Sequence, residues 1–257
     1  MIHELVSLAE LRSACGDDDL MVWNAQDLGS PAGPARARAW ASGGAVVTAA
    51  PAVSRRDRLA VWGDAADAVE LVRHALAELG PAYRPWGDRE LLAWVTAKVD
   101  GLHVAGEFSW MNLPAEKAQA PAGERPGVGD CDVGWLSPEA EGEVAGLLAA
   151  DAPDSYAAPG FAGVRRWAGL RVGGVLASVA ADAWPAPSVG LLAGVATAAA
   201  FRGRGLAERV CRWVTGELVA SYGRASLMVD DDNAAAIAVY ERLGYRLRPV
   251  LASYVST

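Results

Sequence analysis

The stretch that most constrains the fold lies between residues 195 and 207 and reads VATAAAFRGRGLA. Its apolar start is typical of the end of a strand, its glycine- and arginine-bearing middle is typical of a loop, and its end is typical of a first helical turn. Apolar residues then recur on one helical face, at Leu206, Val210, Trp213, Val214 and Leu218. The stretch therefore predicts a strand, a short basic loop and a helix, in that order.

This loop has features that suit a bound phosphate. Gly203 and Gly205 lack a Cβ, so a ligand can approach the backbone amides closely. The first amides of a helix have no internal partner and lie at the positive end of the helix dipole. Arg202 and Arg204 add positive charge beside them. A turn that uses glycine only for its geometry would show the same residues, so both interpretations stay open at this point.

A second stretch, residues 233–245, favours the ligand site. It reads NAAAIAVYERLGY, with Asn233 as a good helix N-cap and Gly244 as the expected left-handed stop. A predicted strand, Ala225–Val229, separates this second helix from the first. The helix carries an apolar stripe at Ile237, Tyr240 and Leu243.

Together the two stretches resemble the GNAT superfamily of acyl-CoA-dependent N-acetyltransferases. The matching positions are Arg202, Gly205 and Ala207 in the first stretch, and Asn233, Ala236, Tyr240, Gly244 and Tyr245 in the second. The resemblance implies an α/β (α+β) fold with a mixed, mostly antiparallel sheet flanked by helices, and it implies acetyl-CoA as cofactor. The arrangement is also similar to glycine N-acyltransferase-like proteins, which leaves a longer acyl group open.

The resemblance also implies roles for individual residues. The backbone of the strand before the loop would hold the pantetheine arm, and the amides of the loop would hold the pyrophosphate. Tyr240 would be the general acid that protonates the departing sulfur, since a phenol with a pKa near 10 suits that task. A packing role for Tyr240 is the alternative, because it shares a face with apolar residues. The implied cofactor-binding residues are Gly194, Val195, Ala196, Thr197, Arg202, Gly203, Arg204, Gly205, Leu206, Ala207, Asn233, Ala236 and Tyr240.

A general base is harder to assign. Many family members carry a glutamate on the fourth strand, but residues 189–195 contain no acid here. Asp182, at the end of the predicted third strand, and Asp230, just after the fifth, are the candidate catalytic bases. Asp231 and Asp232 are more readily explained by capping or solvating the next helix. An acceptor amine that loses its proton to solvent needs no base.

The length of 257 residues predicts two units. We expect a smaller α/β companion domain over 1–125, a catalytic domain over 126–257, and a linker rich in proline, glycine and charge over Leu113–Gly129. The first unit shows strands and two helices, like half of a GNAT domain, so a degenerate GNAT-like domain and an unrelated companion domain are the two alternatives for it. It has no glycine–arginine loop, so we expect it to lack a cofactor site, and no internal repeat is evident in the sequence.

Periodicity and turn residues predict the remaining elements. Helices are expected over Leu5–Ala14, Ala65–Leu79, Asp88–Val99 and Pro138–Leu148. Strands are expected over Leu20–Trp23, Arg36–Trp40, Ala45–Ala49, Arg58–Trp62, His103–Met111, Asp132–Leu136, Arg165–Arg171, Val175–Ala181 and Ser188–Thr197.

Charge and cysteine content exclude several classes of function. A net charge of −8 argues against a general nucleic-acid or membrane-surface binder. Cys15, Cys131 and Cys211 are far apart and show neither metal-ligand spacing nor a disulfide framework, so we expect no metal. The N-terminus lacks a signal pattern and there is no 18-residue apolar run, which favours a cytoplasmic protein.

We therefore expect an enzyme that transfers an acetyl or other acyl group from CoA to a primary amine of a small molecule or amino acid. A protein N-terminal acetyltransferase is the alternative within the same fold. A non-catalytic, CoA-binding regulatory protein is the alternative from another class, and the missing acid in residues 189–195 keeps it open.

The end of the chain predicts a shared sheet. Only 13 residues follow Gly244, and residues 245–255 have room for one long strand or two very short ones. A complete GNAT sheet ends in two strands, so this one is a strand short, and an unpaired edge is an aggregation hazard. We expect the missing strand to come from the N-terminal half or from a second subunit, the latter making a homodimer.

Overall fold

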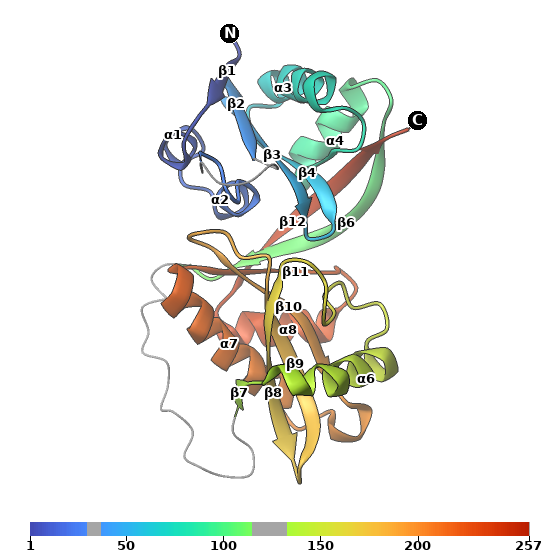
Figure 1. Ribbon diagram of the computed structural model, residues 1–257. Helices are drawn as coiled ribbons and strands as arrows, with labels where there is room; N and C mark the ends of the chain where they lie inside the picture. Colours follow the sequence, from blue (N-terminus) through green and yellow to red (C-terminus); the bar gives the residue numbers. More distant parts are fainter. Residues whose placement is uncertain (30–36, 115–132, 257) are drawn as a thin grey trace.

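A computed structural model describes residues 1–29, 37–114 and 133–256. Two halves are stacked along the long axis of the molecule (Figure 1). The first half contains β1 (His3–Leu5), α1 (Leu8–Ala14), α2 (Asp19–Asn24), β2 (Arg38–Ser42), β3 (Ala45–Val53), β4 (Arg56–Gly63), α3 (Ala65–Leu79), β5 (Arg84–Asp88), α4 (Arg89–Lys98) and β6 (Leu102–Asn112). The second contains β7 (Val133–Trp135), η1 (Pro138–Ala140), α6 (Glu141–Asp151), β8 (Val164–Val172), β9 (Val175–Ala183), β10 (Gly190–Thr197), η2 (Ala199–Phe201), α7 (Leu206–Tyr222), β11 (Ala225–Val229), α8 (Ala234–Leu243) and β12 (Arg246–Val255).

The described strands form one twelve-stranded sheet that runs through both halves, in the order β1-β2-β3-β4-β5-β12-β6-β11-β10-β9-β8-β7. Each half follows the same sequence of elements: a strand, a helical segment, three strands, a helix, a strand, a helix and a last strand. In each half the fourth and fifth strands pair in parallel. The structure therefore contains a repeat of topology that the sequence does not show.

The last strand of each half is inserted into the sheet of the other half. β6 lies between β11 and β12, with Ser109 opposite Val229 and also opposite Pro249. In the same way, β12 lies between β5 and β6, with Leu251 opposite Gly87. The expectation that the N-terminal half supplies a strand to the second sheet is confirmed, and no second subunit is needed for it.

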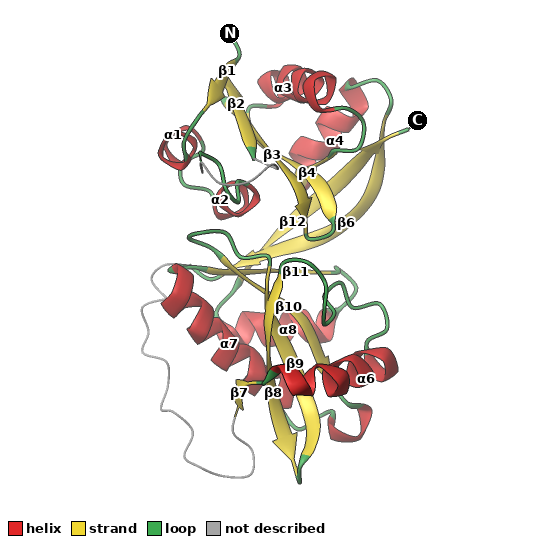
Figure 2. Cartoon of the chain, in the orientation of Figure 1, coloured by secondary structure: helices red, strands yellow, loops and turns green. Residues whose placement is uncertain are grey.

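Three apolar cores hold the layers together. Helices cover both faces of the sheet (Figure 2), and each core lies between a group of helices and the strands beneath it. The first includes Leu11, Trp23, Trp110, Leu147 and Trp184, and so joins α1, α2 and α6 across the two halves. The second lies under α7 and α8, and the third lies under α3 and α4. The halves thus share a core as well as a sheet.

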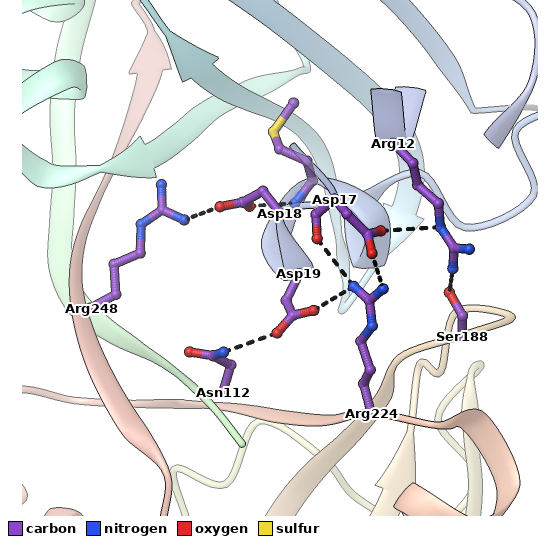
Figure 3. Close-up of polar contacts among 9 residues, drawn as sticks. Arg12, Asp17, Asp18, Asp19, Asn112, Ser188, Arg224 and Arg248 are labelled. Carbon is purple, nitrogen blue, oxygen red and sulfur yellow. Dashed lines mark hydrogen bonds and ion pairs between the residues drawn. The ribbon is translucent and has the colours of Figure 1, made fainter. Parts of the chain in front are cut away.

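Ion pairs also join the halves, at the acidic turn before α2 (Figure 3). Arg224, between α7 and β11, pairs with Asp17 and, at 2.7 Å, with Asp19. Arg248 of β12 pairs with Asp18 at 2.7 Å. Because Asp18 also accepts a hydrogen bond from a backbone amide at the start of α2, this turn fixes a helix of one half against strands of the other.

The structure corrects the prediction for Leu20–Trp23, which lies in helix α2 rather than in a strand. A short apolar run is compatible with a buried helix or a buried strand, and here the Asp18 cap decides the outcome. The helix predicted over Leu5–Ala14 begins only at Leu8, after the short strand β1. Strand β5 was missed because its sequence, RPWGD, carries the proline and glycine typical of a loop.

Most of the other elements agree with the sequence-based expectations to within a few residues. The helix predicted over Ala65–Leu79 and the strand predicted over Ala225–Val229 have the predicted limits. The boundary expected at residue 125, most of the expected linker and Cys131 lie outside the described residues. A separate companion domain therefore stays a prediction.

Candidate functional site

Strand β10 contains a bulge at its centre. Its pairing with β9 shifts register between Ala193 and Ala196. Gly194 lies within the bulge at φ +61°, a left-handed conformation that favours glycine. A Cβ on Gly194 would lie 2.4 Å from the Trp167 ring of β8 and 3.2 Å from the Ala157 Cβ. Both the backbone angle and the close neighbours therefore require glycine here.

Beyond the bulge, β10 separates from β11. Their parallel pairing joins Gly190–Leu192 to Ala225–Leu227, whereas β10 continues to Thr197. Ala193, Gly194, Val195 and Thr197 are half-buried. This part of the strand therefore offers peptide groups along one edge to an extended ligand.

The loop that follows leads directly into the N-terminus of α7. Gly203 and Gly205 have φ values of +75° and +72°, and a Cβ on either would meet nothing within 4 Å. Gly205 is the N-cap residue of α7, and no side chain caps the helix. The first amides of the helix, from Leu206 onward, thus lie beside a loop with open space around its glycines. This is the geometry of an anion site.

The two arginines of the loop make different contacts. Arg202 pairs with Asp151 at 3.1 Å and donates to the Thr197 carbonyl, so it ties the loop to the end of α6. The Arg204 guanidinium lies 5.3 Å from the centre of the Phe201 ring and donates to the Ala200 carbonyl. Among the described residues it has no carboxylate partner. Arg204 therefore keeps an uncompensated positive charge beside the start of α7.

The second sequence motif packs against the first through α7 and α8. Asn233 caps α8 by accepting a hydrogen bond of 3.1 Å from the Ala236 amide, as predicted. Tyr240 is buried at 6% exposure, with its ring centre 6.1 Å from that of Tyr245. Burial, followed by the proximity of Cys211 and Tyr245, raises the pKa of Tyr240 well above 10. Its hydroxyl therefore keeps its proton at neutral pH.

Comparison with known proteins identifies this architecture. A family model described as FR47-like protein matches residues 168–254, which span β9 to α8 and most of β8 and β12. A solved structure from Kribbella flavida, a GCN5-related N-acetyltransferase, is 21% identical with a TM-score of 0.56, covering 84% of this chain and 88% of that chain. The chain has the GNAT fold.

Two further solved structures agree. A protein from Novosphingobium aromaticivorans assigned to the GNAT family is 24% identical with a TM-score of 0.53, covering 84% of this chain and 91% of that chain. A GNAT-family acetyltransferase from Colwellia psychrerythraea is 13% identical with a TM-score of 0.51, and the match covers 100% of both chains. No curated protein sequence matches the chain. The predicted fold class is confirmed, and the two-part architecture recurs in another GNAT-fold protein.

The two expected bases occupy different environments in this GNAT fold. Asp182 of β9 is fully buried, and its Oδ2 atom accepts hydrogen bonds from Arg166 at 3.1 Å and from the Tyr222 hydroxyl at 3.0 Å. Its Oδ1 atom is buried without a partner in the described parts of the chain. Asp230 follows β11 and is exposed. Asp182 therefore already serves an ion pair, and a base role for either residue stays a prediction.

Asp231 contributes to the contact between the halves. It accepts a hydrogen bond of 2.6 Å from Ser109 of β6 and pairs with Arg89 of α4. Beyond the capping or solvating role expected of it, Asp231 therefore makes a contact that the sequence did not indicate. Because β6 was not expected between β11 and β12, this contact could not be foreseen.

The first half has a different structure where the second half has its loop. Strand β4 ends at Gly63 and α3 begins at Ala65, so Asp64 alone connects them and there is no loop to surround a phosphate. The Asp64 carboxylate accepts hydrogen bonds from the amides of Ala66 and Asp67, at 2.9 and 3.3 Å. A negative side chain thus occupies the position that an anion would take. The N-terminus of α3 is thus capped by its own carboxylate, and the expectation that the first half has no cofactor site of its own stays a prediction.

A cavity of about 540 Å³ opens between the halves, near the turn that joins β9 to β10. Sequence reasoning did not identify its lining, because the residues come from five segments. They are Gln26, Asp27, Ala50, Pro51, Ala52, Val53, Ala162, Gly163, Arg165, Trp184, Pro185, Ala186, Pro187 and Tyr222.

Within the described residues, no cluster of three or more histidine, cysteine, aspartate or glutamate side chains is arranged to hold a metal ion. No described helix is both long and apolar enough to cross a membrane.

Proposed function

We propose that the protein is an acetyl-CoA-dependent N-acetyltransferase that acts on a primary amine of a small molecule or amino acid. One observation carries the proposal. The bulged edge of β10 leads, through the short helix η2, into an open glycine loop and an uncapped helix N-terminus. Acetyl-CoA carries a thioester, a peptide-like arm and a diphosphate, in that order. Its length and chemistry fit the strand edge, the glycine loop and the helix N-terminus, in the same order.

The residues of this chain would hold each part of acetyl-CoA differently. The Val195 peptide group and the Thr197 amide, on the free edge of β10, would form strand-like hydrogen bonds with the pantetheine arm, while the Thr197 carbonyl accepts from Arg202. Amides of Gly203 to Ala207 would hold the pyrophosphate, and Arg204 would add charge that no described carboxylate neutralises. Acetyl-CoA supplies the activated acyl carbon. The strand, the loop and the helix supply its position.

Two proton movements complete the transfer. Tyr240 keeps its proton because it is buried, and it is the group that would donate this proton to the sulfur atom as the thiol leaves. The acceptor amine must be neutral to attack. Its proton would pass to Asp230, to Asp182 or to solvent, and solvent suffices for an amine of modest pKa.

The test is the release of free thiol from acetyl-CoA in the presence of a panel of primary amines, with mass spectrometry of the products. An acetylated amine formed only with protein present is expected. Tight acetyl-CoA binding without thiol release from any amine would instead support a non-catalytic, CoA-responsive protein. Acetylation of peptide N-termini in preference to small amines would support the protein N-terminal acetyltransferase.

A further inference from the structure

Arg58 of β4 is a buried cation with few partners. Its side chain belongs to the first half, and the residue is only 7% exposed. Its Nε atom donates a hydrogen bond of 3.0 Å to the Val53 carbonyl. In the described part of the chain this is its one hydrogen bond, and no carboxylate lies within ion-pair distance. Four of its five N–H donors are therefore available to another acceptor.

Aromatic rings surround this guanidinium. Its central carbon lies 5.0 Å from the ring centre of Trp86 and 6.0 Å from that of Trp23. Trp86 in turn stacks on Phe108, with ring centres 6.1 Å apart. Burial lowers the pKa of Arg58 to about 10, so the side chain is still charged at neutral pH. A buried charge without an opposite charge is costly, and cation–π contacts compensate only part of that cost.

Other positive charges lie beside it. Arg84 is opposite Arg58 in the β4–β5 pair. The Arg55 guanidinium lies 4.6 Å from the Phe161 ring centre. Asp57 is the one acid within residues 54–58, and its carboxylate accepts from the Ala52 amide. A protein of net charge −8 thus concentrates positive charge at one place, which an anion would stabilise.

This positive region is next to the proposed transfer site. The Arg55 guanidinium lies 5.4 Å from the ring centre of Tyr156, and the next residue, Ala157, lies against Gly194 of the β10 bulge. Tyr156 therefore contacts Arg55, and its neighbour Ala157 contacts the bulge. Val53, whose carbonyl accepts from Arg58, also lines the cavity between the halves.

We propose that Arg58, buried on Trp86 without a carboxylate partner, binds a carboxylate of the acyl acceptor. The acceptor would then be an amino acid rather than a simple amine, with its carboxylate in the first half and its amine directed towards β10. The guanidinium fork matches a carboxylate in shape and charge, and the aromatic surroundings favour an apolar side chain on the acceptor. This inference rests on the proposed acetyltransferase function.

The test compares amino acids with the amines that remain when the carboxylate is removed. Leucine is paired with 3-methylbutylamine, and phenylalanine with 2-phenylethylamine, in the free-thiol assay with acetyl-CoA. In the wild type the amino acid of each pair should be the better acceptor. In Arg58→Gln, kcat/KM should fall about 100-fold for the amino acids, mainly through KM, and less than about threefold for the amines.

Arg56→Gln is the matched control, because it removes one positive charge from an exposed neighbour in the same strand. Its effect should stay below about threefold on all four acceptors. Arg58→Lys keeps the positive charge but lacks the two-pronged guanidinium group. Its kcat/KM for the amino acids should therefore lie between those of the wild type and Arg58→Gln. A folding defect would reduce the use of amino acids and amines together, so the selective loss distinguishes recognition from stability.

Equal use of amino acids and amines by the wild type, or an equal loss of both in Arg58→Gln, would overturn the role of Arg58 while leaving the acetyltransferase function intact. If no acceptor reacts, the acetyltransferase proposal fails, and calorimetry then decides the role of Arg58 separately. The twenty amino acids are titrated into CoA-saturated protein. Binding that Arg58→Gln abolishes supports the carboxylate site, and no binding to the wild type overturns it.

Discussion

Gly194 and Trp167 meet at the bulge of β10, where a Cβ on the glycine would lie 2.4 Å from the Cη2 atom of the indole. We predict that Gly194→Ala lowers the free energy of unfolding, because the new methyl group must displace the ring. Gly174→Ala is the control, since Gly174 also has a positive φ but has nothing within 4 Å of a Cβ. Both variants place a non-glycine residue in the left-handed conformation and carry that cost. The difference between their free energies of unfolding, about 1–3 kcal/mol, therefore measures the contact with Trp167. Equal losses of stability in the two variants, measured by denaturant unfolding, would show that the Trp167 ring moves aside without cost.

Tyr240 is expected to act through its hydroxyl alone. Tyr240→Phe keeps the buried ring, so acetyl-CoA affinity should survive while turnover falls roughly 10²–10⁴-fold. Because burial raises the pKa of Tyr240 well above 10, the wild-type pH profile should show no falling limb from this residue below pH 10. Stopped assays on a good acceptor from pH 7 to 10 would check both points. Unchanged turnover in Tyr240→Phe would make it a packing residue.

Arg204 and Arg202 should contribute differently to cofactor binding. Arg204 has no carboxylate partner in the described chain, whereas Arg202 pairs with Asp151. Arg204→Ala should therefore weaken CoA affinity more at low than at high ionic strength, since salt screens an exposed charge. Arg202→Ala should show a smaller salt dependence, because its charge is already balanced. Calorimetry at two salt concentrations gives the comparison, and identical salt slopes for the two variants would contradict the account.

Because β6 and β12 are each inserted into the sheet of the other half, we predict that neither half folds by itself. A fragment beginning near residue 129 lacks β6 and would leave free edges on β11 and β12, so it should be insoluble or poorly folded. The full chain cut by a protease site engineered between residues 115 and 132 should instead stay together, because both exchanged strands are present. A soluble, cooperatively melting, CoA-binding monomer from the fragment alone would contradict this.

Local patterns account for what the sequence predicted correctly. The two motifs around Gly205 and Tyr240 are short and contiguous, and so are the capped helix at residues 65–79 and the strand at residues 225–229. The need for an extra strand was also visible, because few residues follow Gly244. Each of these inferences depends only on neighbours in sequence or on length.

Long-range contacts account for what the sequence did not show. The pairing of Ser109 with Val229 joins residues far apart in the chain, and no periodicity encodes its register. In the sequence, Arg58 is one arginine of a predicted strand. Only the fold places the rings of Trp23 and Trp86 beside its guanidinium. The repeated topology was visible only as a resemblance of the first unit to half of a GNAT domain, because the two halves share an order of elements rather than a motif.

The most direct test of the cofactor site is calorimetric titration of acetyl-CoA into the wild type and Gly205→Val. The new side chain meets no protein atom within 4 Å at its Cβ, but it would occupy the space through which a phosphate approaches the α7 amides. Gly173→Val, at a positive-φ glycine in the β8–β9 turn with equally open space, is the control. We predict tight binding to the wild type and to Gly173→Val, and affinity reduced at least tenfold in Gly205→Val. Unchanged affinity in Gly205→Val, or no binding to the wild type, would contradict it.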